Sequence, residues 1–303
     1  MKKKSEEKVF KSGFVAVIGK PNVGKSSLVN KLVGEKVSII SPKAQTTRNR
    51  IFGIKNGEDY QIVFVDTPGV QHTKTKLGEY MTVATDGATT DVDAIIIVLD
   101  ALRINSEDYK IIEKYSKVKC PVFLVINKIE TTNFEKMYPV LSKLNEYTFV
   151  KKFITTSAIR NINIEELENE IIACLSEGEA YYPIDQYTDK TTRFMCSEII
   201  REKALLYLQE EIPHGIAIEI MTYEEGKNLV KINANIITES ERHKQIIIGK
   251  KGEMLKQIGM AARRDIEALV DSKVMIDLFV KIRKDWKDDV IALNELGFSK
   301  KDI

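Results

Sequence analysis

The sequence is poor in the residues that build metal centres and disulfide frameworks. Its 303 residues include only three histidines and three cysteines, and Cys120, Cys174 and Cys196 are far apart along the chain. No two of these cysteines have the spacing of a zinc site or a disulfide-rich scaffold. We therefore expect reduced thiols and no transition-metal site.

Long apolar runs and a strong charge of one sign are also missing. The longest apolar run, Ala94–Leu99, is far too short to cross a bilayer, and the charged residues 1–8 lack the apolar stretch of a signal peptide. The net charge of +2 shows no global preference for nucleic acid or membrane, so a basic surface must be local. With 43% hydrophobic and 30% charged residues, we expect a cytoplasmic protein of two domains.

One glycine-rich stretch has the pattern of a phosphate-binding loop. It reads Gly19-Lys20-Pro21-Asn22-Val23-Gly24-Lys25-Ser26, between the apolar run Phe14–Ile18 and a helical pattern that starts at Ser27. Strand, loop and helix in this order cradle phosphates with backbone N–H groups at a helix N-terminus. We predict that residues 19–27 bind nucleotide, that Lys25 reaches the β and γ phosphates, and that Ser26 binds Mg²⁺.

Strand-like and helical stretches alternate up to about Gly178. The predicted strands are Ile51–Ile54, Gln61–Val65, Ala94–Leu99, Val122–Ile126 and Phe153–Thr156, and the predicted helices are Asn105–Lys117, Phe134–Glu146 and Glu165–Leu175. Such alternation predicts an α/β domain with a mostly parallel sheet, whose ligands bind at the carboxyl ends of the strands.

The segment Asp66-Thr67-Pro68-Gly69 follows one of these strands. Its carboxylate can hold Mg²⁺, usually through water, and Gly69 supplies a backbone N–H and a pivot that could sense the γ-phosphate. Taken alone, the four residues could equally form a plain turn. The next residue, Val70, cannot orient an attacking water as a glutamine does. We therefore expect slow intrinsic turnover, and we interpret the adjacent Gln71 as a surface residue.

The segment Asn127-Lys128-Ile129-Glu130 follows the strand Val122–Ile126. The order of phosphate loop, Asp66–Gly69 and Asn127–Glu130 resembles the translation-factor class of GTPases. The resemblance implies that Asn127 meets guanine N7, that Glu130 accepts from guanine N1–H and the 2-amino group, and that Ser157 and Ala158 form the remaining base-contacting loop. Glu130 departs from the family pattern, which has Asp there. The alternative for Glu130 is a carboxylate stabilised at a helix N-terminus.

Residues 35–50 have the polarity of a mobile surface loop. The segment Gln45-Thr46-Thr47-Arg48 resembles the first switch of Era-type GTPases, which implies that Thr47, rather than Thr46, closes on Mg²⁺ and the γ-phosphate. The resemblance also implies that Asn22 helps to hold K⁺, although an asparagine stabilising its own turn is an equal alternative. The expected catalytic groups are Lys25, Asn22, Thr47 and Gly69, and the expected Mg²⁺ ligands are Ser26, Thr47 and Asp66.

The remainder of the chain predicts a second, smaller domain. A helix from Arg193 to Leu208 precedes two strands, Gly215–Met221 and Leu229–Ile237, and Gly249-Lys250-Lys251-Gly252 then lies between helices before a last strand, Val274–Ile282. This order resembles a type II KH domain. Two glycines let the backbone approach nucleic-acid phosphates, so the segment predicts a clamp for single-stranded RNA.

A local excess of positive charge accompanies this segment. Residues 242–264 contain seven basic residues and one acidic residue. We assign RNA binding to Lys244, Gly249, Lys250, Lys251, Gly252, Lys256, Arg263 and Arg264. The alternative is a solvated helical hairpin, because Gly-x-x-Gly alone is a weak signal.

The combination of these parts resembles the Era family of bacterial ribosome-assembly GTPases. We expect a GTPase domain over residues 8–178, a linker over 179–190, a KH domain over 191–284 and a tail helix over 285–303. The resemblance implies GTP and GDP as ligands, Mg²⁺ and K⁺ as cofactors, binding to the 3′ region of 16S ribosomal RNA, and a role in assembly of the 30S subunit. It further implies a loose association with the inner membrane and no need to oligomerise. The alternative function is an RNA-binding scaffold with a structural, non-cycling nucleotide site.

Overall fold

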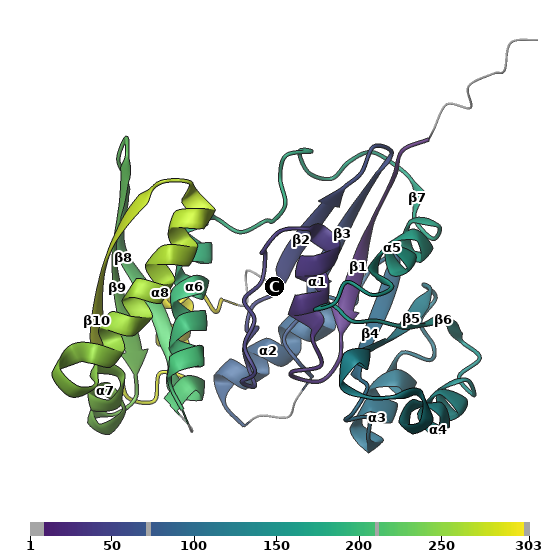
Figure 1. Cartoon of the computed structure of the whole chain (residues 1–303), viewed down its shortest axis with the longest axis horizontal. Coiled ribbons are helices and arrows are strands. Elements are labelled where there is room, and N and C mark those ends of the chain that lie inside the picture. Colours follow the sequence, from purple (N-terminus) through teal and green to yellow (C-terminus); the bar gives the residue numbers. More distant parts are fainter. Residues whose placement is uncertain (1–8, 71–73, 210–211, 300–303) are drawn as a thin grey trace, which may run out of the picture. The chain divides into compact units, whose positions relative to one another are not determined.

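The computed structural model describes residues 9–70, 74–209 and 212–299, which form two compact units (Figure 1). The first unit contains residues 9–38, 50–70 and 84–189. The second contains residues 39–49, residues 74–83 and the described residues from 190 onward. Two short segments that precede residue 84 therefore group with the C-terminal part of the chain.

The first unit is built on a seven-stranded sheet of the described residues. Its strands are β1 (Lys11–Ile18), β2 (Ile51–Asn56), β3 (Tyr60–Asp66), β4 (Ala94–Asp100), β5 (Val122–Asn127), β6 (Val150–Thr155) and β7 (Ser176–Glu177). The order is β2-β3-β1-β4-β5-β6, with β7 paired to β1. Strands β3, β1, β4, β5 and β6 are parallel, whereas β2 and β7 pair in antiparallel fashion. The mostly parallel sheet predicted from the sequence is confirmed.

Helices cover both faces of this sheet. They are α1 (Lys25–Val33), α3 (Ser106–Lys114), α4 (Phe134–Leu144) and α5 (Ile164–Ile172), with the short η1 (Ile129–Thr131) after β5. Most of the helix α2 (Lys76–Gly87) belongs to the second unit. Because side chains alternate along a strand, Val15 and Val17 pack with α1 and α5 on one face, while Ala16 and Ile18 pack with α3 and α4 on the other. Burial on both faces explains why the strands read as continuous apolar runs.

The segment after β7 lies along the open edge of the sheet. The amide of Ile54 in β2 donates to the carbonyl of Tyr187 at 2.9 Å, and Gly53 forms a bridge with Thr188. The Gln61 side chain accepts from the amides of Tyr181 and Tyr182 at 2.7 and 2.9 Å. Residues 181–188 are therefore fastened to β2 and β3 by specific hydrogen bonds.

The second unit is an α+β fold around a three-stranded sheet. Its elements are α6 (Thr192–Tyr207), η2 (Ile212–Gly215), β8 (Ala217–Glu225), β9 (Leu229–Thr238), α7 (Glu241–Ile248), η3 (Lys250–Gly252), α8 (Glu253–Val270), β10 (Lys273–Ile282) and α9 (Val290–Glu295). The central strand β9 pairs in parallel with β10 and in antiparallel fashion with β8. Helices α6 and α8 cover one face of the sheet (Figure 1), where Ile199, Ile266 and Ile232 share a core cluster.

The segments 39–49 and 74–83 are held in this second unit by its C-terminal residues. Leu77 and Tyr80 of α2 share a buried cluster with Trp286 and Phe298. Arg48 is 1% exposed and donates to the carbonyl of Ile216 at 2.6 Å. The expectation of a polar surface loop over residues 35–50 is therefore wrong for Arg48, because its charge is paired with buried carbonyls instead of water.

No helix in the described part of the chain combines the length and the apolar character that a membrane span requires.

Candidate nucleotide and RNA sites

The glycine-rich loop lies between β1 and α1 in the first unit, as the sequence predicts. Helix α1 begins at Lys25, directly after Gly24, which has a φ of 99°. A Cβ at Gly24 would lie 2.3 Å from Nδ2 of Asn127, and a Cβ at Gly69 would lie 2.6 Å from the backbone nitrogen of Pro21. Glycine at these two positions therefore lets the Asn127 and Asp66–Gly69 segments close around the loop.

Three predicted ligand groups meet at the start of α1. The Ser26 hydroxyl donates to Oδ2 of Asp66 at 2.8 Å, and Nζ of Lys25 donates to the carbonyls of Gly19 and Lys20 at 3.1 and 2.9 Å. Burial lowers the pKa of Lys25 to about 8, although the nearby Asp66 carboxylate opposes the shift. Burial likewise raises the pKa of Asp66, against the effects of Lys25 and Ser26.

The donors around Asp66 fit a magnesium ion. Oδ1 of Asp66 is buried and has no hydrogen-bond partner among the described residues. The Ser26 hydroxyl beside it is a second hard oxygen donor, and carboxylate and hydroxyl oxygens are the groups that Mg²⁺ prefers. Ser26 and Asp66 could therefore hold Mg²⁺ next to the phosphates.

The loop that follows β3 is held against the phosphate loop and the sheet. The Thr67 hydroxyl donates to the carbonyl of Val17 at 2.8 Å, and the amide of Val70 donates to the carbonyl of Gly19 at 3.1 Å. The Val70 side chain packs against the core between the sheet and helices α3 and α4. Gln71 lies outside the described residues.

The predicted base-contacting segments converge at the carboxyl ends of β5 and β6. Nδ2 of Asn127 donates to the carbonyl of Val23 at 3.1 Å, while its Oδ1 accepts from the amide of Ala158 at 3.2 Å. The Ser157 hydroxyl accepts from the amide of Arg160 at 3.1 Å. Asn127 thus ties the phosphate loop to the Ser157–Ala158 loop.

Within the segment Asn127–Glu130, the Lys128 side chain is paired, whereas one oxygen of Glu130 is not. Nζ of Lys128 donates to the carbonyl of Asn22 and forms an ion pair with Asp100 at 2.8 Å. Oε2 of Glu130 is buried and has no hydrogen-bond partner among the described residues. A buried carboxylate oxygen without a donor is costly, so this atom suits a ligand that carries N–H groups.

Lys20 belongs to the predicted loop, but its side chain points to another element. Its Nζ lies 2.6 Å from Oδ2 of Asp108 and donates to Oδ1 of Asn105 at 3.0 Å. Asn105 and Asp108 form the capping box of α3. The sequence prediction missed these two residues, although the pattern Asn105-x-x-Asp108 before an apolar stretch is a signal for a helix start.

Thr47 belongs to the second unit, whereas Ser26 and Asp66 belong to the first. The preceding residue, Thr46, lies next to Arg201 of α6, which donates to the carbonyl of Thr46 and pairs with Glu198 at 2.5 Å. The amide of Ile40 donates to Glu202 at 2.9 Å. A role for Thr47 at the metal ion remains a prediction.

The predicted Gly-x-x-Gly segment joins α7 to α8 in the second unit. Ser240 caps α7 by accepting from the amide of His243 at 3.2 Å. Gly249, Lys251 and Gly252 all have positive φ values, of 72°, 54° and 80°. The turn therefore exposes the Lys250 and Lys251 side chains and leads directly into α8.

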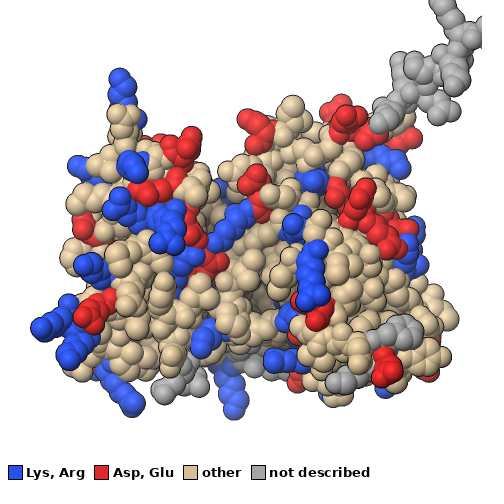
Figure 2. Space-filling view, in the orientation of Figure 1, with Lys and Arg blue, Asp and Glu red and all other residues tan. Residues whose placement is uncertain are grey.

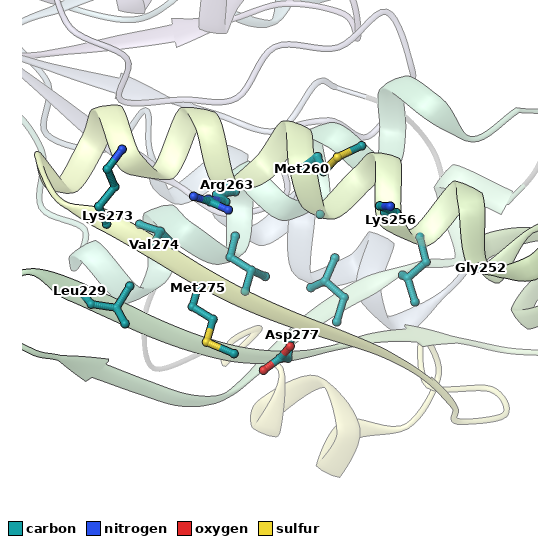
Figure 3. Close-up of a pocket in the computed structure, with 13 residues that line it drawn as sticks. Leu229, Gly252, Lys256, Met260, Arg263, Lys273, Val274, Met275 and Asp277 are labelled. Carbon is teal, nitrogen blue, oxygen red and sulfur yellow. The ribbon is translucent and has the colours of Figure 1, made fainter.

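A groove of about 710 Å³ runs between α8 and β10 (Figure 3). Its lining residues include Gly252, Leu255, Lys256, Gly259, Met260, Arg263, Lys273, Val274, Met275, Ile276, Asp277 and Leu278. The set combines three basic side chains with many apolar ones, and it contains no aromatic residue. Figure 2 shows basic side chains gathered over the part of this unit that contains α7 and α8.

The groove contains only some of the predicted RNA-binding residues. Gly252, Lys256 and Arg263 line it, whereas Lys244, Gly249, Lys250, Lys251 and Arg264 do not. The sequence prediction missed the residues on β10. Alternation of apolar and charged residues is typical of any half-exposed strand, so it does not indicate a binding site. Lys273 is the basic residue that this strand adds to the groove.

Two protein-family models match separate parts of this chain. Residues 14–128 match the model of a 50S ribosome-binding GTPase, and residues 211–287 match that of a KH domain. GTPase Era of Clostridium acetobutylicum is 46% identical, with 96% of this chain and 98% of that protein covered. GTPase Era of Alkaliphilus metalliredigens is 44% identical, with 95% and 99% covered.

Two solved structures resemble the whole chain. One is Era in complex with MgGDPNP and nucleotides 1506–1542 of 16S ribosomal RNA, with a TM-score of 0.91 at 38% identity, covering 96% of this chain and 99% of that chain. The other is a variant of Aquifex aeolicus Era bound to GDP and AlF4⁻, also with a TM-score of 0.91 at 38% identity, covering 96% and 100%. Because relatives named GTPase Era are 44–46% identical over nearly the whole chain, this chain belongs to the Era family of GTPases.

Proposed function

We propose that this chain hydrolyses GTP and binds the 3′ region of 16S ribosomal RNA during assembly of the 30S subunit. The groove between α8 and β10, with basic residues on both sides and an apolar floor, is the observation that carries the RNA half of the proposal. The relative that was solved with MgGDPNP and an RNA fragment supports both halves.

In the nucleotide site, the protein positions charge more than it moves protons. Lys25 and the amides of the glycine-rich loop bind the phosphates, and the bound phosphates favour the protonated form of Lys25. Ser26 and Asp66 would hold Mg²⁺, which would supply positive charge next to the γ-phosphate. Glu130 accepts from the N1–H and the 2-amino group of guanine, both of which adenine lacks, so its unpaired Oε2 favours GTP over ATP.

The second unit holds the segments that are expected to respond to the γ-phosphate. Residues 39–49 are fastened by Arg48, Arg201 and Glu202, and residues 74–83 pack against Trp286. A nucleotide that binds more tightly to one arrangement of these segments increases the population of that arrangement. The free energy of the shift equals the difference between the nucleotide's binding free energies for the two arrangements. RNA and GTP must then change each other's affinity by the same factor.

Two further parts of the proposed function concern a monovalent cation and the membrane. Val70 cannot orient a water molecule, and Asn22 would help to hold a K⁺ ion that would supply positive charge next to the phosphates. In addition, the protein associates loosely with the cytoplasmic face of the inner membrane. Turnover in KCl and in NaCl tests the first part, and flotation with anionic vesicles tests the second.

The decisive experiment measures RNA affinity in three nucleotide states. A labelled oligonucleotide with the sequence of nucleotides 1506–1542 is titrated with the full chain and Mg²⁺, with a GTP analogue, with GDP and with no nucleotide. We expect a difference between the GTP analogue and GDP, and a loss of binding in the double variant Lys250→Glu and Lys251→Glu. Single-turnover cleavage of GTP is followed in parallel.

Two outcomes would contradict the proposal. RNA affinity that does not change with the nucleotide would remove the coupling. Tight GTP binding without cleavage, with RNA present and in either salt, would instead favour the RNA-binding scaffold that Val70 makes conceivable.

A further inference from the structure

One glycine in the second unit is explained neither by backbone conformation nor by packing. Gly259 lies in the interior of α8, the 18-residue helix Glu253–Val270, and its φ is not in the left-handed region. Glycine inside a helix is among the least favourable residues, because it loses the most freedom on folding. Gly252, at the start of the same helix, differs because its φ of 80° favours glycine.

The surroundings of Gly259 leave room for a side chain. A Cβ at this position would meet one atom of the described residues within 4 Å, Cδ1 of Leu278 at 3.5 Å, which is an ordinary van der Waals contact. By contrast, a Cβ at Gly53 would lie 2.9 Å from Val33, so close packing explains that glycine. The fold would therefore accept alanine at position 259 and gain helix stability from it.

The place of Gly259 indicates what the missing side chain allows. Gly259 lines the groove beside Met260, and the side chains of Leu255 and Leu278 line the same groove. Three basic residues, Lys256, Arg263 and Lys273, also line it, from the helix and from the strand (Figure 3). An apolar floor suits the flat face of a base, and the basic groups suit the phosphates on either side.

We propose that one nucleobase of single-stranded RNA binds at Gly259. The base lies flat against the backbone of α8, in the space that a Cβ would otherwise fill. The residues that line the groove include no aromatic side chain on which a base could stack. The face of the base instead contacts the helix surface and Leu278. Gly259 is thus a binding residue that lowers the stability of the unliganded fold. The inference rests on RNA binding by the groove as proposed above.

The test compares stability and RNA affinity in the same variant. Gly259→Ala in the full chain raises the Tm of the second unit by about 2–6 °C, because alanine is the better helix former. The same variant weakens the affinity for the oligonucleotide of nucleotides 1506–1542 by about tenfold, a loss of about 1.4 kcal/mol, because the new Cβ holds one base away from the helix surface. Gln257→Ala, at an exposed position of α8 outside the groove lining, is the matched control and leaves RNA affinity unchanged.

A series of oligonucleotides, each with one abasic position, locates the base. At one position the abasic RNA binds the wild type and Gly259→Ala equally, because the group that meets the new Cβ is gone. The inference is overturned if Gly259→Ala binds the intact RNA like the wild type, or if its Tm falls, since the glycine then serves the fold. If the wild type itself does not bind this RNA, the proposed function fails instead.

Discussion

Arg48 offers a direct test of how the segment 39–49 is held in the second unit. The side chain is 1% exposed, donates to the carbonyls of Ile216 and His214 at 2.6 and 3.3 Å, and stands 5.7 Å from the ring centre of Trp286. Burial, followed by the charge of Arg201, lowers the pKa of Arg48 to about 9. Arg48→Met keeps much of the side-chain length and removes both donors.

The expected loss of unfolding free energy follows from the two carbonyls and the tryptophan ring that lose their contacts with Arg48. Each buried carbonyl that loses its donor costs about 1–3 kcal/mol, and the ring contact contributes about 0.5–2 kcal/mol. Removing a buried charge with a lowered pKa returns part of this cost. We therefore expect the second unit to lose about 2–4 kcal/mol of unfolding free energy.

Trp286 makes the assay specific, because it is the single tryptophan of the chain and lies at the contact. Urea unfolding followed by its fluorescence reports on the second unit, and we expect the midpoint to fall in Arg48→Met. Arg50→Met is the matched control, because Arg50 belongs to the first unit and stacks on Phe52 at 5.1 Å. An unfolding free energy within about 0.5 kcal/mol of the wild type would refute the role of Arg48, since surface substitutions have effects of that size.

Three further predictions concern the nucleotide and RNA sites. Because the pKa of Lys25 is about 8 without nucleotide, GTP affinity should weaken as pH rises above 8, by up to about tenfold per unit, with proton uptake that calorimetry in two buffers detects. Between pH 8 and the ordinary pKa of 10.5 the unfolded chain binds more protons, so the stability of the nucleotide-free protein should rise with pH, and a parallel fall in both quantities would contradict the assignment. Glu130→Ala should bind ATP and GTP with similar affinity in competition assays while Glu130→Asp keeps the preference for GTP, and a selective Glu130→Ala would show that other groups read the base. Lys256→Gln should weaken RNA binding and reduce the slope of log affinity against log salt by about one, and an unchanged slope would place Lys256 away from the phosphates.

The parts of the fold with strong periodicity could be predicted from the sequence. Buried parallel strands such as Ala94–Asp100 read as unbroken apolar runs, and the glycines of the phosphate loop and of the KH turn mark backbone conformations that few other residues adopt. Helix α2 (Lys76–Gly87) was not predicted, although Leu77, Tyr80, Met81 and Ala84 follow helical spacing. Part of that pattern is the surface that packs on Trp286.

The long-range contacts could not be predicted. Arg48 lies among polar residues, so nothing local indicates a partner such as Ile216, which is distant along the chain. The Lys20–Asp108 ion pair is hidden for the same reason, since it joins two motifs that each make sense alone. For the nucleotide site, sequence motifs predicted the residue types, whereas the unpaired oxygens of Asp66 and Glu130 are visible only in three dimensions.

The hydrogen bonds between β2 and residues 187–188 bear on how the first unit can be produced alone. Strand β2 is an outer strand, and an outer strand with unpaired amides is a template for association with other chains. Ile54 and Gly53 are shielded from this by Tyr187 and Thr188. A fragment that ends at Gly178 would leave the outer edge of β2 unpaired and tend to aggregate. A fragment that ends at Asp189 would keep the residues that pair with this edge.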